Sequence, residues 1–411
     1  MDRTVKRILL VAYHYPPEGS SSGVLRTLKF TKYLPEFGWR VHVLTLRQEF
    51  YRQTDEQLLG DIPSGVTIHR TRALDTKRYL GVPDRFVGWV PFGVSAGKKI
   101  VASAGIDALF STSPIPSAHL IAYRLKRRFH LPWVADFRDP WVEEGIWPKP
   151  GSLRYRVESA LERKVILNAD RVTVTTSGLK GELTRRFPEV RKDKFVVIEN
   201  GFDEADFLKI GDDIRPEEER FLILHAGMVN PDYRDPFPLL ECLADLAKSG
   251  KLPKEVRVRF LGGGAYVDSE AFRARVKRLA APEIVEVERR LPYAEGLKLL
   301  LRSNALLLLQ DSEDTRNLIP AKAFEYLRAG RPIITLGQEG ATADLVRDTG
   351  SGLLLDPRDP EQMRRALLTL ITSGDGRACA ARRREAIARY ERRSLTQRLA
   401  ATLEAMLDRA S

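Results

Sequence analysis

Short, nearly continuous apolar runs recur along the chain and alternate with longer amphipathic stretches. Residues 7–12 and 305–310 are typical of strands covered on both faces, as in parallel sheets. The stretches between such runs carry apolar residues at helical spacing, for example from residue 24 to 37. This alternation predicts an α/β chain with two doubly wound, Rossmann-like domains. The expected strands are residues 7–12, 41–46, 66–70, 106–111, 131–136, 171–176 and 195–198, and then 221–226, 256–261, 284–287, 305–310, 331–336 and 352–355.

The boundary between the two domains is expected near residue 200. There the turn Glu199-Asn-Gly-Phe-Asp203 is followed by residues 204–219, which are polar and acidic without clear periodicity and so predict a linker. The predicted domains are therefore residues 1–200 and 201–390. Residues 391–411 are expected to hold a last helix, opened by the capping box Ser394-Leu-Thr-Gln397, with Leu395, Leu399, Leu403 and Leu407 on one stripe.

The most informative stretch is residues 317–330, which follows a buried strand and a polar loop. Pro320 suits the first turn of a helix, and Gly330 suits its end. The start of this helix lies at the carboxyl end of a parallel strand, where such sheets bind ligands. Lys322 and Glu325 share a face there, and a cation beside a carboxylate suits a phosphate and a sugar diol. The structural alternative is a surface ion pair.

Two further stretches of the sequence have residues suited to ligand binding or catalysis. A loop rich in turn residues joins the first strand to the first helix, and Gly19 and Gly23 allow close backbone approach to an anion, although a plain connecting loop has the same pattern. The fifth strand ends in Asp136-Phe-Arg-Asp139, and three charges at the end of an interior strand are costly unless they are used or paired. The place of His119 inside the adjacent helix favours a structural role for this residue.

The composition of the chain limits the kinds of binding partner and the location that are expected. The chain of 411 residues carries a net charge of +12, which indicates an anionic partner: nucleic acid, acidic lipid or a phosphorylated substrate. No nucleic-acid recognition module is found in the sequence. Two cysteines, Cys242 and Cys379, give no disulfide framework, so a cytoplasmic location is expected. The N-terminus does not have the pattern of a signal peptide, and no apolar run reaches the ~20 residues of a membrane span.

The helix Pro320-Ala-Lys-Ala-Phe-Glu-Tyr326 resembles the donor motif of the GT-B glycosyltransferases, particularly the large retaining family 4. The tract Ala135-Asp-Phe-Arg-Asp-Pro-Trp141 is similar to members from bacterial envelope-polysaccharide clusters. The resemblance implies a GT-B fold with a cleft between the domains, a last helix that crosses back to the first domain, a nucleotide diphosphate sugar as donor, and no metal. It also implies that Glu325 holds the ribose hydroxyls, that Lys322 lies near the phosphates, and that Gly19, Gly23 and Arg26 border the acceptor and the donor phosphates.

The sequence departs from the family pattern at three places. A histidine near Arg138 and another near Thr112 or Ser113 are missing, so Asp136, Arg138 and Asp139 become the catalytic candidates, with Asp139 expected at the acceptor hydroxyl. Met228 replaces the arginine that usually follows Gly227, which leaves Arg234 as the best cation for the diphosphate, unless it pairs with Asp232 or Asp235. The glycines at 262–264 suit either a nucleotide contact or a flexible turn.

The third departure is Asn317, which stands where a glutamate usually holds the donor sugar. The enzyme would then use Asn317 or recruit Asp311, Glu313 or Asp314, or the protein would only bind the nucleotide sugar. The resemblance implies a retaining glycosyltransferase of cell-envelope or exopolysaccharide synthesis. The alternatives are a nucleotide-sugar 2-epimerase of the same fold and an inactive, nucleotide-sugar-binding scaffold protein.

The last expectation concerns a membrane surface. Residues 86–92 are aromatic and apolar, and they lie beside Arg85, Lys98 and Lys99, while residues 124–128 form a second basic cluster. Aromatic side chains next to cations suit a lipid interface, which predicts a lipid-linked acceptor and peripheral attachment to the inner face of the plasma membrane. The alternative is that the aromatic side chains fill the core.

Overall fold

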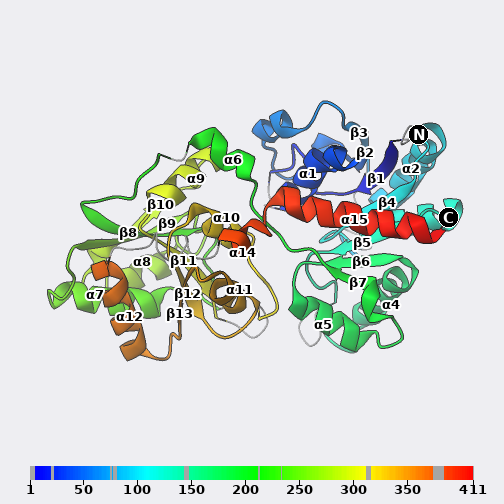
Figure 1. Ribbon diagram of the computed structural model, residues 1–411. Helices are drawn as coiled ribbons and strands as arrows, with labels where there is room; N and C mark the ends of the chain where they lie inside the picture. Colours follow the sequence, from blue (N-terminus) through cyan, green and yellow to red (C-terminus); the bar gives the residue numbers. More distant parts are fainter. Residues whose placement is uncertain are drawn as a thin grey trace. The chain divides into compact units, whose positions relative to one another are not determined.

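The computed structural model describes residues 5–19, 23–74, 76, 81–142, 148–211, 213–232, 234–311, 316–373 and 384–410. The chain divides into two compact units, one comprising Met1–Asn200 with Arg392–Ser411 and the other Gly201–Glu391. Each unit is a parallel sheet with helices on its faces (Figure 1). The fold is therefore a two-domain α/β fold, as the alternating pattern predicts.

The first unit contains a seven-stranded parallel sheet in the order β3-β2-β1-β4-β5-β6-β7. Its strands are β1 (Lys6–Val11), β2 (Trp39–Leu46), β3 (Thr67–Thr71), β4 (Ala108–Thr112), β5 (Trp133–Phe137), β6 (Arg171–Val174) and β7 (Phe195–Val197). Its helices are α1 (Gly23–Tyr33), α2 (Val90–Ala104), α3 (Ser117–Phe129), α4 (Leu153–Asn168), α5 (Ser177–Arg186) and α15 (Arg392–Ala410). The central strands β1, β4 and β5 are largely buried on both faces, which explains their continuous apolar runs.

The second unit has six parallel strands in the order β10-β9-β8-β11-β12-β13. The strands are β8 (Arg220–Ala226), β9 (Glu255–Leu261), β10 (Val285–Glu288), β11 (Ala305–Gln310), β12 (Ile333–Gly337) and β13 (Gly352–Leu355). The helices are α6 (Glu204–Ile210), α7 (Phe237–Lys248), α8 (Glu270–Val276), α9 (Tyr293–Arg302), α10 (Lys322–Ala329), α11 (Ala341–Thr349), α12 (Pro360–Ser373) and α14 (Arg384–Ala388).

The strand order fixes where each unit can bind a ligand. The direction of winding reverses between β1 and β4 in the first sheet, and between β8 and β11 in the second. Ligands of doubly wound sheets bind outside the carboxyl ends of the strands at this reversal. The loop with Gly19 follows β1, Gly227 follows β8, and Lys322 follows β11. The residues singled out in the sequence thus lie at the favoured edge of each sheet.

Helix α15 belongs to the first unit although unit 2 separates it from the rest of that unit in sequence. Leu395, Leu399 and Leu403 are fully buried in a cluster with apolar residues of β1, β2 and α1. Figure 1 shows this helix, in red, alongside α1. The apolar stripe expected at the end of the chain therefore completes one face of the first sheet.

Three local boundaries differ from the sequence analysis. The linker expected at residues 204–219 begins instead with α6, because Asp203 caps the helix at the Ala205 N–H and Phe207 is fully buried. The capping box at 394–397 lies inside α15, where the Thr396 hydroxyl donates to the Arg392 carbonyl. Helix α10 starts at Lys322, two residues after Pro320.

The aromatic patch at residues 86–92 is largely part of the core. Trp89 is fully buried and its indole donates to the Thr71 hydroxyl at 2.8 Å, while Phe86 packs on Tyr13. Helix α2 then packs against α3 so closely that a Cβ on Gly97 would lie 2.6 Å from a Leu125 methyl group. The expectation that the aromatic residues 86–92 face a lipid interface is therefore wrong for Trp89 and Phe86, whose rings are packed within the protein.

Candidate functional site

The start of α10 brings a lysine against the end of β8. Lys322 Nζ lies 3.0 Å from Nε2 of His225, whose Nδ1 donates to the Leu307 carbonyl at 2.8 Å. Because Nδ1 carries the proton, Nε2 is the acceptor for Lys322. Burial lowers the pKa of both Lys322 and His225 well below their usual values, and Arg234 lowers both further. An arriving anion would therefore raise the pKa of the Lys322 amine.

Gly227, directly after β8, faces this amine. Its φ of +107° lies in the region that favours glycine, and a Cβ there would lie 3.3 Å from Lys322 Nζ. A side chain at this position would be strained and would crowd the cation. The glycine therefore keeps the backbone close to Lys322 and leaves room for a ligand.

The carboxylate and the tyrosine that follow Lys322 on α10 have separate partners. Glu325 Oε1 accepts from the Tyr293 hydroxyl at 2.9 Å, and this tyrosine opens α9. The Tyr326 hydroxyl, fully buried, accepts from the Ala226 N–H at 2.8 Å. Tyr326 thus ties α10 to the end of β8, while Tyr293 orients the carboxylate. Glu325 also raises the pKa of Lys322, because the two side chains share a face of α10.

Arg234 lies in the loop after β8 and is half-buried. Its NH1 group donates to the Met228 carbonyl at 3.5 Å, next to Gly227, and its charge contributes to the lowered pKa of both Lys322 and His225. Asp235, a partner considered for Arg234, is engaged by Arg275, whose guanidinium donates to its two oxygens at 3.2 and 3.1 Å. The structure therefore brings together Arg234, Lys322, Glu325 and Gly227, four of the five donor-site residues predicted.

The fifth, Asn317, is exposed in the turn before α10. Of the acidic residues considered as its substitutes, Asp311 accepts from the Gln338 amide at 3.0 Å, and Glu313 and Asp314 lie outside the described residues. The glycines at 262–264 support the loop after β8, because the Gly263 carbonyl accepts from the Val229 N–H at 2.9 Å.

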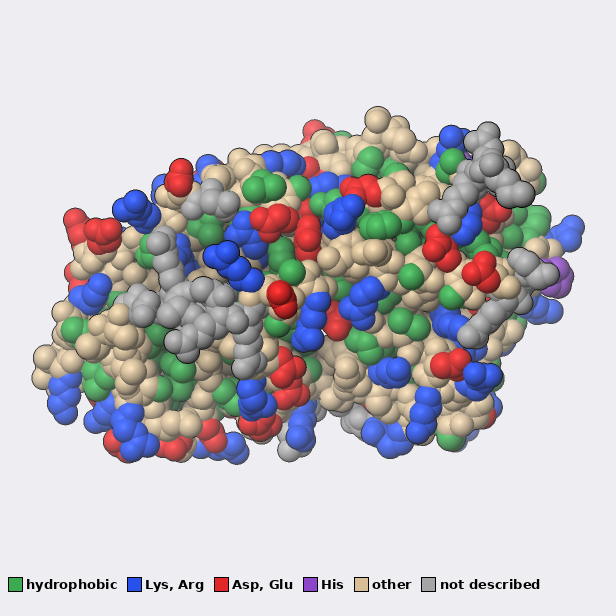
Figure 2. Space-filling view, viewed as in Figure 1, with side chains coloured by type: hydrophobic (Ala, Val, Ile, Leu, Met, Phe, Trp, Pro, Cys, Tyr) green, Lys and Arg blue, Asp and Glu red, His purple; other side chains and the backbone are tan. Residues whose placement is uncertain are grey.

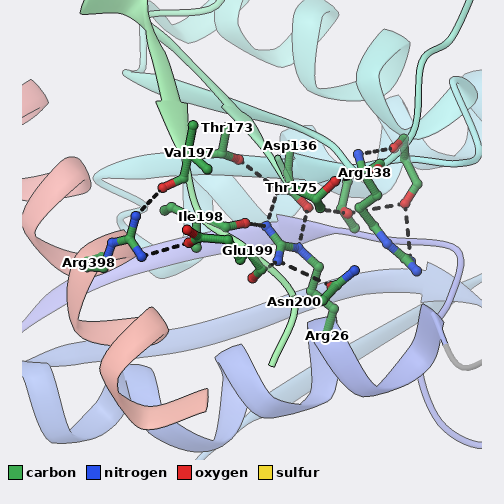
Figure 3. A network of polar contacts seen from close by, with 12 residues as sticks. Arg26, Asp136, Arg138, Thr173, Thr175, Val197, Ile198, Glu199, Asn200 and Arg398 are labelled. Atoms are coloured by element: carbon green, nitrogen blue, oxygen red, sulfur yellow. Dashed lines mark hydrogen bonds and ion pairs between the residues drawn. The ribbon is translucent and has the colours of Figure 1, made fainter. Parts of the chain in front are cut away.

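In the first unit, Arg26 and Asp136 form a buried ion pair (Figure 3). The guanidinium donates to the two Asp136 oxygens at 2.7 and 3.0 Å, and the hydroxyls of Thr112 and Thr173 donate to the same carboxylate, each at 2.7 Å. Asp136 is fully buried. Burial alone would raise its pKa, but Arg26 and the two hydroxyls hold that pKa below its usual value.

The remaining N–H groups of Arg26 hold the end of the first unit. They donate to the carbonyls of Ile198 and Glu199 at 2.9 and 2.7 Å and to the Asn200 side chain at 3.4 Å. Each of the five donors of the guanidinium thus has a protein acceptor. This geometry differs from the expected roles: Arg26 has no donor left for a phosphate, and Asp136 is too enclosed to meet a substrate hydroxyl. Within the protein, the pair ties α1 to β5 and to the residues that follow β7.

Arg138, rather than Arg26, covers the start of α1. Its NH1 group donates to the Gly23 carbonyl at 3.1 Å, and its backbone N–H donates to the Ser113 hydroxyl at 2.8 Å. A Cβ on Gly23 would lie 2.5 Å from that NH1 group, so the glycine allows the guanidinium to cover the start of α1. Its Nε is buried and has no acceptor within the described part of the chain. Burial lowers the pKa of Arg138, and Asp139 opposes this.

Of the remaining site candidates, Asp139 is exposed to solvent and Gly19 is buried. Asp139 is exposed, next to Arg138, so its carboxylate is available to a substrate. Gly19 is buried, and a Cβ there would lie 2.9 Å from Asp55. Its N–H donates to the Gln53 carbonyl at 3.0 Å. Close packing of the loop against residues 53–55 thus accounts for Gly19 without a ligand.

Several residues of these clusters were not found by sequence reasoning. Thr112 ends β4 and Thr173 lies near the end of β6, and polar residues near the ends of buried strands would have been a usable signal. His225 is a buried polar residue near the carboxyl end of β8, the same kind of signal. Tyr293 gave none, because its contact with Glu325 joins two helices far apart in sequence.

Two family models match the chain, and together they cover most of it. A glycosyl transferase 4-like domain matches residues 23–201, and glycosyl transferases group 1 matches residues 220–373. The chain belongs to the GT-B glycosyltransferases of the family 4 type. The resemblance noted in the sequence is thereby confirmed. These matches do not favour the 2-epimerase or the scaffold alternative.

Relatives of known name agree with this family. The D-inositol 3-phosphate glycosyltransferase of Salinispora tropica is 27% identical over 282 residues, which cover 64% of this chain and 56% of the relative. The chain thus matches only about half of the length of this curated relative. A similar structure is sucrose-phosphate synthase from Thermosynechococcus elongatus (16% identity, TM-score 0.70, 99% of this chain and 100% of that chain). Another is Anabaena HepE in complex with UDP-glucose (15% identity, TM-score 0.66, 97% and 99%).

The described residues contain no group of three or more His, Cys, Asp or Glu side chains arranged to hold a metal ion. Nor does any helix in the described ranges combine the length and the apolar character needed to cross a membrane.

Proposed function

We propose that this glycosyltransferase moves a sugar from a nucleoside diphosphate sugar to an acceptor hydroxyl with retention at the anomeric carbon, in the synthesis of a cell-envelope or extracellular polysaccharide. The observation that carries the proposal is the cluster at the start of α10. Lys322 lies there against the Gly227 turn, within electrostatic range of Arg234 and Glu325. A buried cation with a lowered pKa, facing an open glycine turn at a helix start, suits a phosphate group.

The donor roles follow from this geometry. Lys322 and Arg234 would bind the diphosphate, and Glu325, held by Tyr293, would accept hydrogen bonds from the ribose hydroxyls. Asn317 would contact the donor sugar from the turn before α10. The similar structure of HepE was determined with UDP-glucose, which supports a nucleotide sugar as partner.

The leaving diphosphate is proposed to need no metal ion, because two cations can offset its charge in a partly buried site. Turnover should then be unchanged after dialysis against EDTA. A loss of turnover that Mg²⁺ or Mn²⁺ restores would contradict this part of the proposal.

On the acceptor side, Asp139 would contact the hydroxyl that receives the sugar. Arg138 would bind negative charge next to it, because its guanidinium covers the first turn of α1, whose backbone N–H groups lack helical partners. Arg26 and Asp136 would hold the ends of α1, β5 and β7 in place for these two residues.

A lipid-linked acceptor on an anionic membrane is the finer part of the proposal. On the face shown in Figure 2, cations and anions are interspersed, so the net charge of +12 is not concentrated there. Helices α2 and α3, however, pack with Gly93 against Ile121 and Gly97 against Leu125, which makes them parallel and in register. The exposed cations of these two helices therefore lie at similar heights along the helix axes: Lys98, Lys99, Arg124, Arg127 and Arg128. Each contributes about 1 kcal/mol near an anionic surface, so together they suffice for reversible attachment of a cytoplasmic enzyme.

Flotation with vesicles of phosphatidylglycerol and phosphatidylcholine tests this attachment. The protein should float at low salt, release as salt rises, and lose binding when Lys98, Lys99 and Arg127 are all changed to Gln. A triple Gln variant at Lys248, Lys251 and Lys277, three exposed lysines of the second unit, is the matched control and should still float. Protein that stays in the soluble fraction at low salt would indicate a soluble acceptor.

The central experiment is a calorimetric and thermal-shift screen of nucleoside diphosphates and their sugars, since a ligand of the folded state raises stability. Transfer with the best donor is then followed by NMR, which reports the anomeric configuration of the product directly. Failure of every nucleoside diphosphate to bind would overturn the proposed function. Inversion at the anomeric carbon would overturn only the stereochemical part.

A further inference from the structure

A small pocket in the first unit lies beside Asp139 and is not used by the donor site. Its volume is 190 Å³, and its lining includes Asp84, Ser113, His119, Asp139, Trp141 and Glu158. Pockets for drug-sized ligands measure about 300–1,000 Å³, so this one suits a single ring. All of these residues belong to one unit, so the pocket does not depend on the second unit.

His119 supplies the pocket with a hydrogen-bond donor. The side chain is fully buried, its ring stacks on Phe137 at 4.9 Å between centroids, and its Nδ1 lies 2.8 Å from the Ser111 hydroxyl. Its Nε2 is buried and has no partner within the described part of the chain. A histidine with one satisfied and one unsatisfied nitrogen at a pocket wall is therefore available to a ligand.

The neighbouring tryptophan decides which nitrogen carries the proton. The Trp133 indole donates to the same Ser111 hydroxyl at 2.9 Å, and an indole N–H can only donate. The hydroxyl proton of Ser111 then needs an acceptor, and His119 Nδ1 is the one within reach. Nε2 therefore carries the ring proton and donates to the pocket. Burial lowers the pKa of His119 to about 4, so the ring is neutral at pH 7.

The other polar groups of the pocket are carboxylates. Asp84 accepts from the backbone N–H and the hydroxyl of Ser117, at 2.7 and 3.0 Å, and so caps α3. Glu158 is nearly fully buried and accepts from the Trp141 indole at 3.2 Å and from Arg154 at 2.6 Å. Asp139 is exposed at the rim. Within the described lining there is no Lys or Arg side chain, so an entering group meets three carboxylates.

We propose that this pocket seats an uncharged, hydroxyl-bearing ring of the acceptor, a sugar or polyol without a phosphate. The inference rests on the proposed function and deepens it by naming the chemistry of the acceptor. Ring hydroxyls donate to carboxylates and accept from the His119 N–H, and Trp141 offers an apolar wall for ring C–H groups. A phosphate would instead find no cation in the described lining and would be repelled by Asp84 and Asp139, whereas the charge of Glu158 is paired with Arg154. The acceptor chemistry thus differs from that named for the curated relative, D-inositol 3-phosphate.

Matched ligand pairs test the proposal on the full chain without nucleotide. The probes are myo-inositol against D-myo-inositol 3-phosphate, and methyl α-glucoside against its 6-phosphate, measured by ligand-detected NMR titration. The neutral member of the better pair should bind at least about tenfold more tightly than its phosphate. Asp139→Lys should narrow or reverse this preference, since Asp139 is exposed and its replacement leaves the core intact. Glu56→Lys makes the same charge change at another exposed site of the unit and should keep the wild-type ratio.

His119→Gln tests the donor and should weaken the neutral ligand while leaving nucleoside diphosphate binding unchanged. A phosphate that binds as tightly as its neutral partner in the wild type would overturn the proposal. Failure of both pairs in a protein that binds a nucleoside diphosphate would also overturn it, but would leave the proposed function standing. Binding of the neutral ring by a protein that binds no nucleoside diphosphate would support the pocket assignment and contradict the proposed function.

Discussion

Neutralising Asp136 is the sharpest test of whether the buried ion pair positions the site or reacts. Asp136→Asn keeps the shape of the side chain but replaces one acceptor oxygen by an NH₂ group. Each oxygen of Asp136 accepts from Arg26 and from one threonine hydroxyl. A threonine hydroxyl can rotate and accept from the new NH₂ group, but the Arg26 guanidinium can only donate. The variant therefore places the new NH₂ group at position 136 against an N–H group of Arg26. It also leaves the buried Arg26 without its counter-charge.

Breaking a buried pair by removing one partner costs about 3–5 kcal/mol. With a urea slope of roughly 2–3 kcal/mol/M, the unfolding midpoint of the first unit should fall by about 1–2.5 M. The chain offers a selective probe, because its five tryptophans, at positions 39, 89, 133, 141 and 147, all belong to the first unit. Tryptophan fluorescence therefore follows this unit separately from the second.

Two variants control the measurement. Asp193→Asn breaks an exposed pair with Arg191, whose nitrogen and oxygen are 3.0 Å apart, and should change stability by less than about 1 kcal/mol. Arg26→Met combined with Asp136→Leu removes both charges and should recover part of the loss. The pKa of Asp136 lies below its usual value, so the wild type loses this stabilisation as the pH falls below about 4, and Asp136→Asn should not. If Asp136→Asn unfolds like the wild type but has lost turnover, this reasoning is refuted, and Asp136 takes part in the reaction itself.

Three further predictions concern the donor site. Glu325→Gln should weaken nucleoside diphosphate binding by about 1.5–3 kcal/mol in calorimetry without altering the fold, because a charged hydrogen bond to the ribose is lost; unchanged affinity would remove Glu325 from the site. Arg234→Gln should weaken a nucleoside diphosphate far more than the matching monophosphate, and equal losses would make Arg234 a structural residue. Lys322 has a lowered pKa that an anion would raise, so diphosphate binding should take up a proton at a pH between the pKa values of the free and the bound amine, seen in calorimetry in buffers of different ionisation enthalpy. Lys322→Met should abolish the uptake, and wild-type binding without uptake would show that the amine is already charged.

The outline of the fold follows from the sequence because the central strands of both sheets, β1, β4, β8 and β11, are buried apolar runs between helices. The donor cluster could also be predicted, since Lys322 and Glu325 lie on one helix and their spacing alone places them on one face. Residues whose role depends on distant partners could not be assigned in this way. Arg26 is a helix residue next to a glycine-rich loop, and nothing local shows that its acceptors are Asp136 and the carbonyls near residue 199. Trp89, beside basic residues, has the local pattern of a membrane anchor until its contact with Thr71 is known.

The place of α15 has a consequence for the order in which the protein forms during synthesis. Arg398 donates to the Val197 carbonyl and to Glu199, and the buried leucines of this helix cover apolar side chains of β1 and β2. The first two hundred residues thus emerge from the ribosome before the helix that covers one face of their sheet. At about 5–20 residues per second, roughly 10–40 seconds pass before α15 is made. During that interval, while the second unit is being synthesised, the first unit still exposes the apolar surface of Ile8, Phe30 and Trp39 to chaperones.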